Sequence, residues 1–142
     1  MDDPQPEVDT RATQMAHEQM PFAKELGLEV VSARGGEVRA RAAWSAERCT
    51  AAGMLHGGFL MAVADSMGAV CAVLNLPPEA AGTTTIESKT NFFRAVRAGR
   101  IWLTTVPVHV GRTTIVVQTD VTDDRGKLVS RSTQTQAVVR SG

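Results

Sequence analysis

The chain contains one long apolar stretch among shorter segments in which apolar and polar positions alternate. Residues 57–74 carry apolar or small side chains almost throughout, and Asp65 is their only formal charge. A helix that is apolar on all sides is usually buried. Its length is borderline for a membrane span, but a charge at the bilayer centre is costly. We therefore predict a buried core helix of a soluble protein, about 27 Å long.

The remaining segments are predicted to be strands, from a two-residue period or from their β-branched and aromatic residues between turn signals. In residues 37–44, for example, Val38, Ala40 and Ala42 share one face. Short turns separate most of these segments, and strands joined by short turns are antiparallel. Pro107 cannot donate to a ladder, so its strand should carry a bulge or lie at an edge. The predicted strands are residues 26–33, 37–44, 83–93, 101–110, 113–122 and 127–139.

This order of elements predicts the α+β class, with an antiparallel sheet of five or six strands wrapped around one central helix. Residues 1–21 begin with a polar, proline-containing tail that we expect to be mobile. A short helix follows, for which Thr10 is the expected cap and Pro21 the expected end. Residues 22–142 then form a single domain. The N-terminus lacks the basic and apolar pattern of a signal peptide, so we expect a cytoplasmic location.

The composition excludes several function classes. Fifteen basic and fifteen acidic residues cancel, which argues against binding nucleic acid or a membrane surface through bulk charge. Cys49 and Cys71 do not make a disulfide framework, and we expect Cys71 to pack in the core. His17 and His109 have no partner at a metal-ligand spacing, so we predict no metal site.

The candidate chemistry lies in the long helix. A buried carboxylate at Asp65 is either held by hydrogen bonds in a structural role or kept for catalysis. Gly57 and Gly58 either permit a tight helix entry or leave amide N–H groups open as an oxyanion site. His56 and Asp65 lie nine residues apart, about 13 Å along the axis and on opposite sides. If the two ends cooperate, the carboxylate must therefore come from a second copy in a two-fold homodimer.

The sequence resembles the hotdog-fold acyl-CoA thioesterases, and within them the phenylacetate-degradation branch. The resemblance covers roughly residues 22–139 and is carried by Leu55-His56-Gly57-Gly58, Ala64-Asp65, residues 85–94 and Gly111-Arg112-Thr113. It implies an enzyme that hydrolyses the thioester of an acyl- or aryl-acyl-coenzyme A without a cofactor. It also implies a homodimer or a homotetramer.

The resemblance assigns roles to individual residues. Asp65 corresponds to the general base or nucleophile, and the Gly57 amide corresponds to the oxyanion donor. Gly58 allows close approach, and His56 orients the thioester or the helix entry. Thr85 corresponds to the hydroxyl that holds the attacking water beside the carboxylate. A thiolate leaves readily, so one base and one oxyanion site suffice chemically.

Other positions are less determined. The branch often has an asparagine six residues before the histidine, where this chain has Thr50, whose hydroxyl offers no amide fork. We expect the acyl pocket to draw on Met54, Leu55, Phe59 and Met61. The phosphates of coenzyme A would be held by local positive charge from Arg94 or Arg112, or from Arg97 or Arg100, unless these are solvated turn residues.

Two alternative functions stay open at this point. A non-catalytic acyl-CoA-binding protein would use the same groove, but mere binding does not need Asp65. A hydratase or dehydratase of enoyl-CoA would call for a histidine–carboxylate pair, which is not evident beside Asp65.

Overall fold

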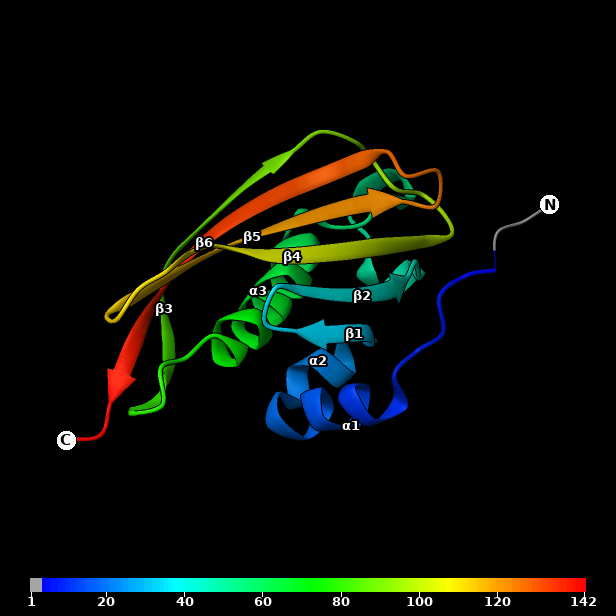
Figure 1. Ribbon diagram of the computed structural model, residues 1–142. Coiled ribbons are helices and arrows are strands. Elements are labelled where there is room, and N and C mark those ends of the chain that lie inside the picture. The colour runs from blue at the N-terminus through cyan, green and yellow to red at the C-terminus, as the bar shows by residue number, and fades with distance from the viewer. Residues whose placement is uncertain (1–3) are drawn as a thin grey trace.

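The computed structural model describes residues 4–142 and contains a six-stranded antiparallel sheet in the order β1-β2-β4-β5-β6-β3. Figure 1 shows the sheet curving over helix α3, with α1 and α2 on the side of β1. The predicted α+β class is therefore confirmed. The strands are β1 (Glu29–Arg34), β2 (Glu37–Ala43), β3 (Ala80–Phe92), β4 (Arg100–Val110), β5 (Thr114–Asp123) and β6 (Leu128–Arg140).

Helix α3 spans Gly57–Leu74, the stretch that the sequence predicts. Val63, Met67 and Cys71 recur every four residues on its inner face and are fully buried beneath the sheet. Burial of an aliphatic or methionine side chain contributes about 1.5–3 kcal/mol, so this row anchors the core. By length and composition α3 resembles a membrane span, but half of it is buried and it is the core helix of this fold.

The other side of α3 is not covered, which corrects the expectation of burial on all sides. Met61, Asp65 and Val73 are exposed at four- and eight-residue spacings, with 38% of Met61 and 53% of Val73 accessible. Asp65 is therefore a solvent-facing carboxylate in the single chain and not a buried one. Hydrophobicity alone does not separate a core face from an interface face, because both are apolar.

Strand β3 forms one edge of the sheet and, within residues 4–142, pairs only with β6. None of its residues is buried, and 64% of Ile86 and 50% of Phe92 are exposed. The register shifts between Thr85 and Glu87, which leaves Ile86 as a bulge. A long open edge strand is a template for pairing with another chain.

The N-terminal segment differs from the prediction in two details. Helix α1 (Thr10–Gln19) is capped by Asp9 and not by Thr10, because the Asp9 carboxylate accepts the N–H of Ala12 at 2.9 Å. Pro21 does follow that helix, but it also opens a second short helix, α2 (Pro21–Glu25), at the position where proline is favoured. Residues 26–28 therefore lead into β1 as a turn and not as a strand.

The hairpin and bulge predictions are confirmed. Arg34 pairs with Glu37 across the Gly35-Gly36 turn, so β1 and β2 form a two-residue hairpin. The pairing of β4 with β5 shifts between Pro107 and His109, where the missing proline N–H interrupts the ladder.

Candidate active site

The entry to α3 is arranged around the side chain of His56. Its Nδ1 accepts the N–H of Gly58 at 2.8 Å and so caps the helix. A neutral His56 must then carry its proton on Nε2. Within residues 4–142 the N–H of Gly57 has no hydrogen-bond acceptor, and it points out at the positive end of the helix dipole. The Gly57 amide is therefore free to bind a negatively charged oxygen.

An aromatic ring lies against this amide. A Cβ at Gly57 would approach the Cζ atom of Phe92 to 3.3 Å, closer than ordinary contacts. The glycine thus lets the end of β3 pack on the helix entry, and Phe92 flanks the free N–H. A role for Phe92 does not follow from the sequence, because an aromatic residue in a strand usually indicates packing.

Asp65 and Thr85 lie at the two ends of a buried hydrogen-bond network. Gln134 on β6 donates from Nε2 to Oδ1 of Asp65 at 3.0 Å. Gln136 donates from Nε2 to the side-chain oxygen Oε1 of Gln134 at 3.1 Å and to Oγ1 of Thr85 at 2.8 Å. Thr83 completes the network by donating its hydroxyl to Oε1 of Gln136 at 3.0 Å. The structure therefore links the predicted carboxylate and the predicted hydroxyl through two glutamines.

Sequence reasoning missed these glutamines, although a signal was present. Strand β6 presents polar residues to the core side at every second position, namely Ser130, Ser132, Gln134 and Gln136, all at least 98% buried. Its other face is also polar. Buried polar groups need partners, and Gln134 and Gln136 have theirs in Asp65 and Thr85.

A groove of about 650 Å³ opens beside the start of α3. Its apolar wall combines α2 with the first turns of α3, through Phe22, Leu26, Phe59 and Ala62. Arg48 adds a guanidinium 5.5 Å from the centre of the Phe59 ring. The volume lies within the range of small-molecule pockets. His56 and Gly58 also line the groove, so it adjoins the free Gly57 amide.

Among the predicted pocket residues, only Phe59 lines this groove. Leu55 is buried, with its N–H bonded to the carbonyl oxygen of Val96 at 2.9 Å. Met61 lies on the exposed side of α3, and Met54 is half-buried. Thr50 is exposed, and its N–H donates to the carbonyl oxygen of Met54 at 2.8 Å.

The predicted arginines lie at opposite ends of the sheet. Arg94 follows β3 at the end where Phe92 pairs with Ser130 of β6. Arg112 lies in the turn between β4 and β5 at the other end, and its carbonyl oxygen accepts a bond from Arg140 at 3.2 Å. A single chain therefore does not bring Arg94 and Arg112 together.

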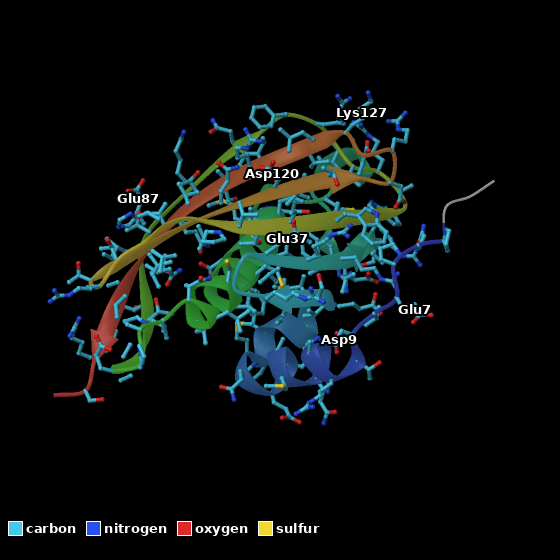
Figure 2. The ribbon with its side chains drawn as sticks, viewed as in Figure 1. Glu7, Asp9, Glu37, Glu87, Asp120 and Lys127 are labelled. Atoms are coloured by element: carbon cyan, nitrogen blue, oxygen red, sulfur yellow. The ribbon has the colours of Figure 1, made fainter. Side chains whose placement is uncertain are left out.

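The end that carries Arg94 is also the end at which α3 begins. Figure 2 shows Lys127 there, in the turn between β5 and β6. The N–H of Lys127 donates to Asp123 and lowers the pKa of that carboxyl, and the positive charges of Arg125 and Arg94 add to the effect.

The cysteines do not join the site. Burial raises the pKa of the Cys71 thiol to about 11, so this thiol stays protonated in the core. Cys71 thus packs beneath the sheet, as the sequence predicts, and Cys49 is partly exposed. Residues 4–142 contain no group of three histidine, cysteine or acidic side chains that is placed to hold a metal ion.

The two candidate catalytic groups lie on one helix but do not meet. Gly57 is the first residue of α3, and Asp65 follows eight residues later, about 12 Å along the axis. The free N–H and the carboxylate of one chain therefore do not contact the same reacting atom. Residues 52–130 match the family described as the Thioesterase superfamily, which is more than half of the chain. The chain belongs to the thioesterase superfamily.

Two proteins of similar sequence illustrate this membership. A protein of Vibrio cholerae is 39% identical over 89 residues, which are 63% of this chain and 59% of that protein. This thioesterase-superfamily chain thus spans less than two thirds of that relative's length. The 1,4-dihydroxy-2-naphthoyl-CoA hydrolase of Listeria monocytogenes is 26% identical over 119 residues, which are 84% of this chain and 96% of that enzyme.

A solved structure gives the same result for the fold. The phenylacetic acid degradation protein PaaI of Thermus thermophilus superposes with a TM-score of 0.76 and is 31% identical. The superposition covers 84% of this chain and 99% of PaaI. The sheet around α3 is therefore the hotdog fold of the superfamily, as the resemblance implied.

Proposed function

We propose that this protein is an acyl-CoA thioesterase that releases a free acid and coenzyme A at sites shared between two copies of the chain. The observation that carries the proposal is the pairing on α3 of an open amide at Gly57 with an exposed, glutamine-held carboxylate at Asp65. The proposed chemistry uses both groups at one reacting carbonyl. The name of the Listeria relative supports an acyl-CoA substrate.

Two surfaces of the single chain support a homodimer. Met61, Asp65 and Val73 form an uncovered row on α3, and β3 beside it is an open edge. A two-fold axis between two such surfaces sets the helices antiparallel. The start of one α3 then faces the middle of the other, which brings Gly57 of one copy towards Asp65 of the second.

In this arrangement, the carbonyl oxygen of the thioester accepts the N–H of Gly57. The helix dipole stabilises the negative charge that develops on that oxygen. Asp65 of the second copy acts as a general base on water or attacks the carbonyl carbon itself. The thiolate of coenzyme A leaves, and it needs little help from an acid because it is a good leaving group.

The groove beside α3 is proposed to hold the acyl group. Its aromatic wall of Phe22 and Phe59 suits a flat aryl-acyl chain, and it starts next to the Gly57 amide. The positive charges at the same end of the sheet, including Arg94 and Lys127, would meet the phosphates of coenzyme A. Arg112 lies at the other end of the sheet and would contact these phosphates only if it came from a second copy of the chain.

The direct test compares the wild type with Asp65→Asn on a panel of aryl-acyl and linear acyl-CoA thioesters. Release of free thiol is followed, and the oligomeric state of each protein is measured under the same conditions. Loss of a general base typically lowers kcat by about 10²- to 10⁴-fold. Asparagine keeps the shape and one acceptor oxygen, so folding and dimerisation should not change.

Equal rates for the wild type and Asp65→Asn would remove the catalytic proposal and leave a non-catalytic acyl-CoA-binding protein. Preference for linear over aryl acyl groups would reject the aryl-lined groove as the acyl pocket. Pairing of dimers into a tetramer, the cytoplasmic location and hydrolysis without a cofactor also belong to this proposal, and none of them is needed for the test.

A further inference from the structure

Gln134 and Gln136 form a buried pair of amide side chains, and Gln134 contacts the Asp65 carboxylate. Both side chains are at least 98% buried on β6, between the sheet and α3. Glutamine is mostly exposed in proteins, and a buried amide costs free energy unless its donors and acceptor are satisfied. Apolar residues would fill the same space without this free-energy cost. The positions of these two glutamines therefore call for an explanation beyond packing.

We propose that Gln134 is a positioning residue that fixes the orientation of the Asp65 carboxylate for catalysis. Gln134 donates from Nε2 to Oδ1 of Asp65 at 3.0 Å. Within residues 4–142 the other oxygen, Oδ2, accepts no hydrogen bond. One carboxylate oxygen is thus held by the chain's own core, and the other is left to face a water molecule or the thioester.

The direction of every bond in the network is determined. An ionised carboxylate only accepts, so Gln134 must turn its NH2 group towards Asp65 and its carbonyl oxygen away. That oxygen accepts from Gln136 at 3.1 Å. The side-chain oxygen Oε1 of Gln136 in turn accepts a hydrogen bond from Oγ1 of Thr83 at 3.0 Å. The chain of donors from Thr83 to Asp65 prevents the Gln134 amide from flipping.

The network also leaves Thr85 with one free function. Gln136 donates to Oγ1 of Thr85 at 2.8 Å, so this oxygen is already an acceptor. The hydroxyl proton of Thr85 is then available to donate outward from the exposed strand β3. The same two glutamines therefore orient both the carboxylate and the hydroxyl.

A glycine in the middle of α3 makes room for this arrangement. A Cβ at Gly68 would overlap the Oε1 atom of Gln134, and the Cδ atom of Gln134 would lie only 2.8 Å from it. Glycine inside a helix is unfavourable compared with alanine, and Gly68 is fully enclosed. Its presence is explained if the position of the Gln134 amide matters more than helix stability.

The inference rests on the proposed function, because Gln134 acts only through Asp65. The main test is Gln134→Met, which keeps an unbranched side chain of similar length but removes the donor. We expect kcat to fall about 10- to 100-fold, because a misplaced catalytic group loses this much. KM should stay within about threefold, because the lost contact is not a binding contact.

A double variant separates positioning from a structural role. In Asp65→Asn/Gln134→Met, the second substitution should cost no further activity, because the group that Gln134 positions is already gone. A structural role would instead give losses that multiply. Thr119→Val is the matched control: it removes a buried hydrogen bond of 2.8 Å to Thr105 in the same sheet, and this bond is not part of the series from Thr83 to Asp65. This control should keep kcat within about twofold.

Gly68→Ala gives a second route that does not depend on how Gln134→Met folds. The added methyl group displaces the buried Gln134 amide, so kcat of the folded variant should fall. Unchanged kcat in folded Gln134→Met and Gly68→Ala, with Asp65→Asn inactive, would overturn the inference and leave the proposed function intact. Full activity of Asp65→Asn would overturn the proposed function itself.

Discussion

Substitution of Gly57 by proline should remove the proposed oxyanion donor without disturbing the helix. Gly57 is the first residue of α3, so its N–H takes no part in the helical hydrogen bonds. Proline is favoured at this position. The preceding residue, His56, has φ of −65° and ψ of 137°, an extended conformation that is compatible with a following proline. The His56 cap on Gly58 is also retained.

The expected loss of activity follows from the single donor that is removed. Loss of one oxyanion donor costs about 10²- to 10³-fold in kcat, which is about 2.7–4 kcal/mol of transition-state stabilisation. The free energy of unfolding should change by less than about 1 kcal/mol, because proline restricts the unfolded chain whereas its Cβ has to displace the Phe92 ring. Activity should therefore fall steeply while stability changes little.

The assay measures kcat for hydrolysis of an aryl-acyl-CoA together with urea denaturation. Gly57→Ala is the matched control, because it keeps the N–H and adds only a Cβ that moves the Phe92 ring by a few tenths of an ångström. The alanine variant should keep activity within about tenfold of the wild type. A folded Gly57→Pro protein with more than about a tenth of wild-type kcat would refute the assignment of this amide.

Three further predictions concern the core and the turns. Met67→Ala should lower the free energy of unfolding by about 2–5 kcal/mol in urea denaturation, since Met67 is fully buried beneath the sheet; a loss below about 1 kcal/mol would contradict this packing. Burial raises the pKa of the Cys71 thiol to about 11, so this thiol should react with a thiol reagent at pH 8 only as fast as the protein unfolds. Cys49 is partly exposed and should react in the native protein. Asp123 has a lowered pKa in the folded state. Its charge therefore stabilises the protein at any pH above the pKa of aspartate in the unfolded chain, which is about 3.9. This stabilisation disappears as the pH falls through the pKa of Asp123 in the folded state. The melting temperature of Asp123→Asn should therefore be lower than that of the wild type at pH 7 and equal to it in acid, and a difference that does not depend on pH would contradict this.

The sequence predicted the fold well where a regular pattern was imposed by burial. The apolar run from Gly57 to Leu74 coincides with α3, and the alternation in residues 37–44 gave the inner face of β2 correctly. Pro107 and the Gly35-Gly36 pair located a bulge and a hairpin, because each residue type limits the backbone directly.

The errors arose where two physical causes give the same pattern. Met61 and Val73 are apolar whether they face the core or a second copy, so the exposed side of α3 was not recognised. Asp9 and Thr10 are both good helix caps, and only the geometry of the chain decides between them.

The glutamines of the site were missed for a related reason. Gln134 and Gln136 look like the solvent-facing positions of a strand, although they lie on its inner face. A polar inner face becomes recognisable only when the neighbouring strand and helix are in place, since these supply the partners in Thr85 and Asp65.

Complementation between two inactive variants tests the shared site most directly. Asp65→Asn and Gly57→Pro are mixed, unfolded and refolded together, and thiol release is compared with that of each variant alone. In a mixed dimer one site combines an intact Gly57 with an intact Asp65, and the other site has lost both. Random mixing should therefore restore about a quarter of wild-type activity, because half of the dimers are mixed and each has one working site of two. A mixture no more active than the sum of its two components would show that no site is built from two chains.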